Sequence, residues 1–404
     1  MTTAPNVRFL DRNTPPHVST LILLAGVSAL NMSIFLPSLN NMALYYDADY
    51  GVMQLAVSAY LAATAILQVG VGPLSDRYGR RPVVMAGLAI FTLASIGCLF
   101  APTVGIFLAF RMLQAVVASG MVLSRAIVRD IFPPAESASM LGWVTMGIAL
   151  VPMVGPMAGG ILDQAFGWQA SFAFLVFAGL AVMALCWVDL GETVSGEGVS
   201  FARQLRTYPE LLSSPRFWGY AGCAALGSGA FFALLGGASF VSDKVYGLSP
   251  LWTGIALGSP AVGYALGNGL SGRYSTSVGI NRMALAGTLT AAAGMAVSLV
   301  VTLAGVDHPI AFFGFCTFLG LGNGLMLPNA TAGSLSVRPE LAGTASGLGG
   351  AIMIGGGAVL SALAGALLTE QTGTIPLQII MLMTSVGAAI CILLVIRRER
   401  RLGL

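Results

Sequence analysis

Twelve apolar runs, each long enough to cross a membrane as a helix, occupy most of the chain. They lie at about 19–39, 52–72, 83–101, 104–128, 138–161, 169–189, 216–241, 251–272, 283–304, 309–334, 342–367 and 375–396. Only 9% of the 404 residues are charged, against about 25% in soluble domains. We therefore expect an all-α membrane protein with 12 transmembrane helices. This composition argues against a soluble enzyme, a disordered chain and a nucleic-acid binder.

The basic residues indicate how these helices are oriented. With the N-terminus inside, 17 of the 19 Lys and Arg residues fall in cytoplasmic segments or at the helix ends next to them. Lys244 falls outside, and Arg111 falls within a span. Because cytoplasmic loops carry an excess of Lys and Arg, we expect both termini to be cytoplasmic.

The chain also divides into two related halves. A shift of 200 residues places Gly72 and Gly79 on Gly272 and Gly279, which bound the loop between the second and third runs of each half. Two six-helix repeats around a midplane site are a transporter architecture. The pattern predicts an N-terminal six-helix bundle (1–189), a cytoplasmic linker (190–215) and a C-terminal six-helix bundle (216–404).

The loop after the second run reads Gly72-Pro-Leu-Ser-Asp76-Arg77-Tyr-Gly79-Arg80-Arg81-Pro82. We expect its two glycines to permit a tight turn at the membrane surface. An aspartate there can accept hydrogen bonds or pair with a nearby arginine, and the arginines suit an anionic leaflet. The loop resembles the G-x-L-x-D-R-x-G-R-R signature of the major facilitator superfamily in full: Gly72, Leu74, Asp76, Arg77, Gly79, Arg80 and Arg81.

That resemblance implies a major facilitator fold, in which this loop latches the two halves together at the inner side. Asp76 would then lie near the start of the eleventh helix, and Arg129 at the end of the fourth. By the same resemblance the loop is not a substrate site.

The fourth and fifth runs are similar to the drug:proton antiporter branch of that family. Phe110-Arg111-Met-Leu-Gln114-Ala115 resembles R-x-x-Q-G, with Ala115 in place of glycine. The fifth run resembles G-x-x-x-G-P-x-x-G-G, with valine in place of the first glycine. The small residues would let this helix approach the eighth or its neighbours closely, and its proline would bend it. The resemblance implies exchange against protons, through Pro152, Gly155, Pro156, Gly159 and Gly160.

Arg111 lies about eight residues into the fourth run, where an arginine costs at least ~2.5 kcal/mol on insertion scales. We therefore expect it to face the bundle interior. It either contacts substrate or takes part in proton coupling, or it makes a structural hydrogen bond. With no acid nearby, it favours anionic or strongly polar substrates over lipophilic cations.

The first run resembles the D-x-Y-L-P-x-L-P segment of the bicyclomycin/chloramphenicol-resistance subfamily, but with Ser33 and Phe35 in place of Asp and Tyr. None of the 16 acids lies at the middle of a span. The usual proton carrier is therefore missing. Either an acid at the rim, such as Asp130 or Asp163, takes the proton, or the coupling is unusual.

By family analogy, the first, fourth, seventh and tenth helices line a central cavity. Aromatic and Met side chains would form an adaptable apolar wall, and amides would supply polar anchors. The candidates, with one residue from the second helix, are Asn31, Phe35, Tyr60, Arg111, Gln114, Phe231, Phe232, Asn323 and Met326.

The sequence thus predicts a secondary active exporter of drugs or other small molecules, working as a monomer by alternating access in a bacterial inner membrane. Its energy source would be the proton gradient, with no cofactor, metal or catalytic residue; no nucleotide-binding, metalloprotease or serine-nucleophile motif is present. Three alternatives stay open: an exporter of an endogenous metabolite such as an amino acid, an uncoupled facilitator, and a non-transporting membrane sensor or scaffold.

Overall fold

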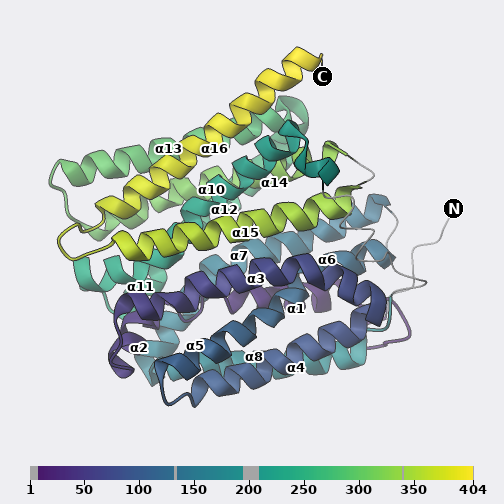
Figure 1. The fold of residues 1–404 in the computed structure, drawn as a ribbon, viewed down its shortest axis with the longest axis horizontal. Helices are drawn as coiled ribbons and strands as arrows, with labels where there is room; N and C mark the ends of the chain where they lie inside the picture. Colours follow the sequence, from purple (N-terminus) through teal and green to yellow (C-terminus); the bar gives the residue numbers. More distant parts are fainter. Residues whose placement is uncertain (1–7, 132–133, 194–208, 339–340, 404) are drawn as a thin grey trace.

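The computed structural model describes residues 8–131, 134–193, 209–338 and 341–403 (Figure 1). Within these ranges the regular structure is entirely helical. The longer elements are α1 (Val18–Leu30), α2 (Leu39–Tyr45), α3 (Tyr50–Tyr78), α4 (Arg80–Leu99), α5 (Val104–Leu113), α6 (Ala118–Ile131), α7 (Pro134–Phe166), α8 (Gln169–Asp189), α10 (Pro215–Phe240), α11 (Pro250–Leu257), α12 (Ser259–Val278), α13 (Ile280–Leu303), α14 (Cys316–Ser336), α15 (Ala342–Leu367) and α16 (Ile375–Leu402). Four short turns of helix join some of them: η1 (Leu36–Ser38), η2 (Gln114–Val117), η3 (Val241–Val245) and η4 (Ile310–Gly314).

Each of the twelve apolar runs falls on one helix or on two or three consecutive helical segments. In the part of the chain that is described, nine helical segments are long and apolar enough to cross a membrane. Large apolar side chains such as Ile66, Phe177 and Val300 project from their outer faces, as lipid contact requires. The expected all-α, multi-pass membrane fold is confirmed. The exact number of spans and the side on which the termini lie stay predictions.

The helices lie side by side in two groups (Figure 1). In the first group α1 packs against α6 and α7, and α4 packs against α8; in the second, α10 packs against α14, α15 and α16. The groups meet along α3 with α15 and along α7 with α11. Much of the expected linker, 194–208, lies outside the described residues, so the domain boundaries stay a prediction.

The two glycines after the second run do not play the same role, and here the expectation from sequence was half wrong. Gly72 lies inside α3, which continues to Tyr78, and only Gly79 makes the turn. Its φ of 95° is a backbone conformation that favours glycine. Gly279 repeats the turn after α12 with a φ of 92°, and each glycine N–H donates to the serine four residues before it. The relation between the halves is therefore visible in the backbone.

The first apolar run is not one continuous helix. α1 ends at Leu30, irregular turns cover 31–35, and η1 and α2 follow. Pro37 within η1 has no backbone N–H to donate. The interruption exposes backbone carbonyl groups inside the protein, where they need donors.

Candidate functional site

Arg111 supplies those donors. Its side chain is 0% exposed. Nε donates to the Ala56 carbonyl at 3.0 Å, and Nη2 donates to the Asn31 carbonyl at 2.9 Å, at the end of α1. Nη1 donates to Asn31 Oδ1 at 2.8 Å and to Gln114 Oε1 at 2.7 Å. One guanidinium therefore joins the interrupted α1 to α3 and to the start of η2.

Two aromatic rings complete the surroundings of this guanidinium. Its carbon lies 3.9 Å from the ring centroid of Tyr60 and 4.4 Å from that of Phe35. The Tyr60 hydroxyl accepts from Asn31 Nδ2 at 3.1 Å, and Gln114 Nε2 donates to Ser95 Oγ at 2.7 Å. The structure thus brings together all five cavity candidates from the N-terminal half.

The Arg111 network holds a positive charge with neutral groups. Among the described residues, no carboxylate lies within ion-pairing distance of Arg111. Carbonyl dipoles and ring faces stabilise the cation instead. Four of the five N–H groups of the guanidinium already donate, and Arg111 is 0% exposed, so a substrate can reach it only if neighbouring side chains move. In this conformation every contact of Arg111 is with the protein itself, as expected for a residue that makes structural hydrogen bonds.

The four candidates of the C-terminal half lie on α10 and α14. The Phe231 and Phe232 rings are 6.1 Å apart, and all four side chains are buried. Asn323 Oδ1 lies 3.5 Å from the point where a Cβ at Gly227 would stand, next to the Met326 methyl. Within the described ranges, no hydrogen bond or ring contact links these four to the Arg111 network. Asn323 has no hydrogen-bond partner there either, so its amide is free to bind a ligand.

The charges of the loop between α3 and α4 are used within the N-terminal half. Arg80 pairs with Asp76 and, through Nε, with Asp130 Oδ2 at 3.0 Å. Its Nη1 donates to Ser75 Oγ at 2.5 Å. Glu192 caps α4 by accepting from the backbone N–H of Arg80 at 2.9 Å. Sequence reasoning missed Glu192, because nothing in its own neighbourhood points to a helix end more than a hundred residues away.

The expected position of Asp76 beside the eleventh helix is not visible in the structure. α15 begins at Ala342, and the side chains of 342 and 343 lie outside the described ones. Arg129 does lie in the last turn of α6, as expected. Arg77 and Arg81 stack on neighbouring rings, and Leu74 is exposed. The role of this loop as a latch between the halves stays a prediction.

The glycines of α7 allow two very close helix contacts. A Cβ at Gly159 would stand 1.6 Å from the Ile34 carbonyl oxygen, in the turn after α1. A Cβ at Gly160 would stand 2.3 Å from the Pro250 carbonyl oxygen of α11, which is the first part of the eighth span. Gly155 lies against Ser33, and Pro152 and Pro156 lie within the same helix. Small residues on α7 therefore permit the approach that the sequence predicted.

All hydrogen bonds between the two halves, within the described ranges, lie at one end of the molecule. Asn40 Nδ2 donates to the Ser239 carbonyl at 2.9 Å, and Ser239 Oγ donates to the Leu36 carbonyl at 2.5 Å. Gln54 Nε2 donates to the Ser361 carbonyl at 2.7 Å. Tyr50 completes the set by donating to a carbonyl of α10.

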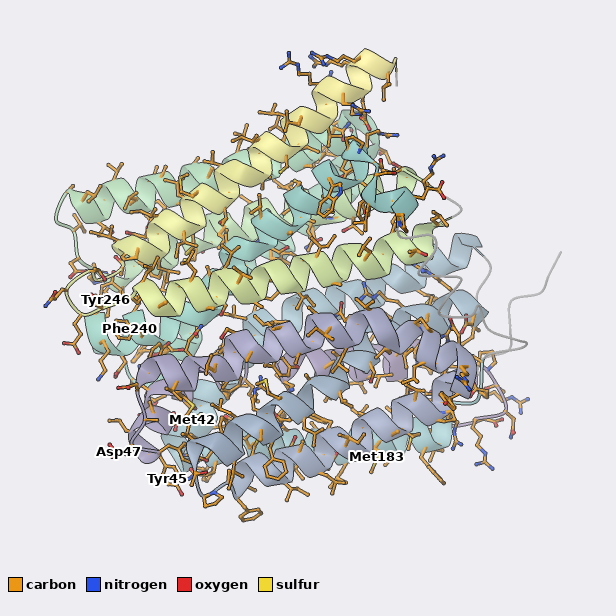
Figure 2. All side chains as sticks on the ribbon, in the orientation of Figure 1. Met42, Tyr45, Asp47, Met183, Phe240 and Tyr246 are labelled. Carbon is orange, nitrogen blue, oxygen red and sulfur yellow. The ribbon has the colours of Figure 1, made fainter. Side chains whose placement is uncertain are left out.

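That end is opposite the arginine-rich end of α16. Met42, Asp47, Phe240 and Tyr246 mark it in Figure 2. Gln54, which sequence reasoning also missed, could have been found: Gln54 and Gln68 are two glutamines fourteen residues apart in an apolar run, on one face of a helix.

Comparison with known proteins identifies the family of this chain. Residues 21–353 match the Major Facilitator Superfamily. The chain belongs to this superfamily. Its members are transporters and not enzymes.

Curated relatives of this superfamily cover most of the chain. An "Uncharacterized MFS-type transporter YdgK" from Bacillus subtilis (strain 168) is 31% identical over 90% of this chain and 91% of its own. "Multidrug resistance protein D" from Escherichia coli (strain K12) is 29% identical over 92% and 93%. The "Chloramphenicol resistance protein" of Pseudomonas aeruginosa is 29% identical over 83% and 82%. The resemblance to the drug-resistance branch is thereby confirmed.

A solved structure agrees on the fold. A bacterial homologue of the human lysosomal transporter Spinster, in an inward-facing and occupied conformation, superimposes with a TM-score of 0.71. It covers 94% of this chain and 96% of its own, at 17% sequence identity.

Proposed function

We propose that this major facilitator protein is a proton-coupled exporter of small molecules that works by alternating access in a bacterial inner membrane. The observation that carries the proposal is the one-sided joining of its halves, by hydrogen bonds at the end opposite the arginine-rich terminus of α16. With the predicted orientation, the joined end faces outward, and the substrate path opens toward the cytoplasm. Relatives named for drug resistance support export of drugs. The protein would act as a monomer and draw on the proton gradient without a cofactor.

The substrate would bind between the Arg111 network and the free amide of Asn323. This places a polar wall on one half and an aromatic wall, with Phe231 and Phe232, on the other. The cation in a water-poor interior suits anionic or acceptor-rich compounds. Efflux of a cationic dye, a neutral compound and an anionic compound from proteoliposomes tests this substrate preference. Preferential export of the cationic dye contradicts it.

Asp163 is the better of the two candidate proton carriers. Asp130 is an ion-pair partner of Arg80. Asp163 is only 7% exposed, accepts from Asn41 Nδ2 at 2.9 Å, and has no cationic partner among the described residues. It can gain and lose a proton without breaking an ion pair. Its place on α7, three residues after Gly160, lies next to the α7–α11 contact, so protonation there can be coupled to opening of the joined end.

Transport driven by an imposed pH gradient tests both the function and the carrier. We expect Asp163→Asn to lose gradient-driven transport while it keeps exchange of labelled for unlabelled substrate. Asp243→Asn is the matched control, because that acid also lies toward the joined end but is half-exposed beside Lys244. Transport by the wild type that ignores the gradient indicates a facilitator and refutes antiport. Gradient-driven transport by Asp163→Asn refutes the carrier alone.

A further inference from the structure

The last turns of α16 carry a dense positive charge. Arg397, Arg398, Arg400 and Arg401 surround Glu399, and α16 reaches Leu402 at the edge of the molecule (Figure 1). Within the described ranges, none of these four arginines makes an ion pair or a side-chain hydrogen bond.

Glu399 does not neutralise its neighbours, because its carboxylate is already used. It points into the bundle, where Arg216 Nη2 donates to Oε1 at 2.6 Å and Nε donates to the same oxygen at 3.1 Å. The Tyr220 hydroxyl at 3.0 Å and Asn281 Nδ2 at 2.5 Å also donate to it. One acid thus anchors α16 to α10 and α13 and leaves four cations on the outer surface.

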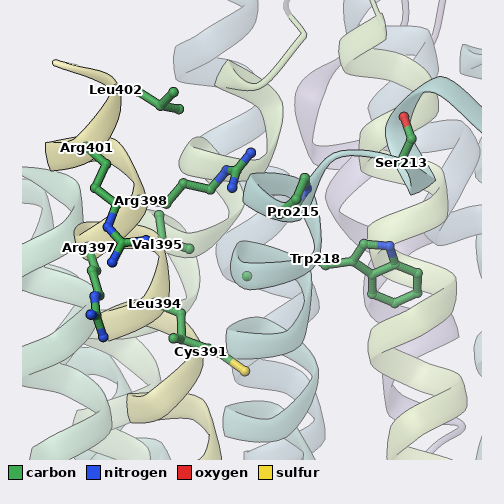
Figure 3. A pocket seen from close by; sticks show the side chains of 11 residues that line it. Ser213, Pro215, Trp218, Cys391, Leu394, Val395, Arg397, Arg398, Arg401 and Leu402 are labelled. Carbon is green, nitrogen blue, oxygen red and sulfur yellow. The ribbon is translucent and has the colours of Figure 1, made fainter.

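A groove lies on each side of this anchored helix. The groove between α10 and α16 has a volume of about 860 Å³. Leu394 and Val395 line its floor, and Arg397, Arg398 and Arg401 lie closer to the helix end (Figure 3). α10 and α16 pack closely beneath this floor, because a Cβ at Gly219 of α10 would stand 2.2 Å from Val395 Cγ2.

The groove between α13 and α16, about 690 Å³, repeats this arrangement. Leu393 and Ile396 supply its apolar lining, and Arg282, Arg397 and Arg400 supply the charge. In each groove the apolar part faces the middle of the membrane, and the cationic part faces its surface. This is the polarity of a phospholipid, with the acyl chain inward and the phosphate outward.

We propose that these two grooves are binding sites for anionic phospholipids of the cytoplasmic leaflet. The phosphate would lie against Arg398 and Arg401 in the first groove and against Arg282 and Arg400 in the second. One acyl chain would follow Leu394 or Leu393 toward the membrane interior. Trp218 marks the depth of the headgroups: its ring is 47% exposed, its Nε1 donates to the Leu212 carbonyl at 2.7 Å, and tryptophan favours the interface.

The occupant is a lipid because both parts of each groove match one. A free phosphate uses the arginines but not the apolar floor, and a zwitterionic lipid uses the floor but carries no net charge to offset the cations. Clusters of arginines beside a transmembrane helix on the cytoplasmic side attract anionic headgroups. A bound lipid would neutralise cations that no acid of the described chain neutralises.

Native mass spectrometry of the purified full-length protein, incubated with equal amounts of phosphatidylglycerol and phosphatidylcholine in detergent, measures the preference directly. We expect the wild type to retain phosphatidylglycerol. R398Q/R401Q changes only the first groove, so we expect it to retain one phosphatidylglycerol fewer than the wild type while the second groove keeps its lipid. The control is R8Q/R12Q, which removes two predicted cytoplasmic charges outside either groove.

A second variant separates a lipid from a phosphate ion. L394N keeps every arginine but places an amide on the groove floor, and it should lower retention of phosphatidylglycerol while R398K/R401K should preserve it. An equal loss in R8Q/R12Q overturns the proposal, because it means general surface attraction. Unchanged binding in R398Q/R401Q, or displacement of all lipid by excess inorganic phosphate together with normal binding in L394N, also overturns it. Size-exclusion profiles like that of the wild type establish that each variant is folded.

Discussion

Replacing Arg111 by lysine separates the charge of this residue from its geometry. Lysine keeps the positive charge but has three N–H donors on one nitrogen, whereas the guanidinium makes four hydrogen bonds from three nitrogens. At least one buried acceptor then loses its donor, at a cost of about 1–3 kcal/mol. The loss of planar stacking on Tyr60 and Phe35 costs about 1 kcal/mol more. We expect Arg111→Lys to lower the free energy of unfolding by about 2–4 kcal/mol.

Thermal unfolding of the purified protein in detergent, with transport in proteoliposomes, measures both consequences. Arg273→Lys is the control, since that arginine lies in the last two turns of α12, is exposed, and belongs neither to the Arg111 network nor to the predicted latch. If the geometry matters, Arg111→Lys is less stable than the control and transports poorly despite its charge. Stability equal to the control, with normal transport of anionic substrates, would refute the structural role and leave charge as the function of Arg111.

Two glycine substitutions extend the test to the helix contacts and the turn. In Gly160→Ala the new methyl group would stand 2.3 Å from the Pro250 carbonyl oxygen, so α7 and α11 must separate. We expect a cysteine introduced at the joined end to be labelled faster in this variant. An unchanged labelling rate contradicts a role of the α7–α11 contact in closing that end. Gly79→Ala forces a φ of 95° and a ψ of 149° on an L-residue and brings the methyl to 2.3 Å from Glu192 Oε2. We expect a loss of about 1–3 kcal/mol in unfolding free energy, because this extended conformation with positive φ is almost confined to glycine. Gly72→Ala places a methyl group inside α3 with no atom within 4 Å, so it should not destabilise the protein in the same unfolding experiment, because alanine is favoured over glycine within a helix. An equal loss there would show that the turn is not the cause.

The candidate site was predictable in its residue types but only partly in its arrangement. Arg111 was conspicuous as a charge within an apolar run, and Asn31 and Gln114 as amides near it in the expected helices. Their actual connection depends on a break in α1 that periodicity does not reveal, since the residues on both sides of the break are equally apolar. Ala56 contributes only a backbone carbonyl, and any residue type has one. The C-terminal candidates are buried, but the Arg111 network does not extend to them among the described residues, and their place in a central cavity stays a prediction.

The sequence by itself shows the features that depend only on neighbouring residues, namely the helices and the turns between them. Long apolar runs must become helices in lipid, because their backbone groups find no other partners there. Gly79 and Gly279 mark turns because of their own conformational freedom. Tertiary structure decided which charges meet. Asp130 pairs with Arg80, fifty residues earlier in the chain. Glu399 turns inward to Arg216 and leaves its arginine neighbours outside, and Arg111 reaches groups from three helices. Such pairings depend on distances across the fold, and the order of residues along the chain does not contain them.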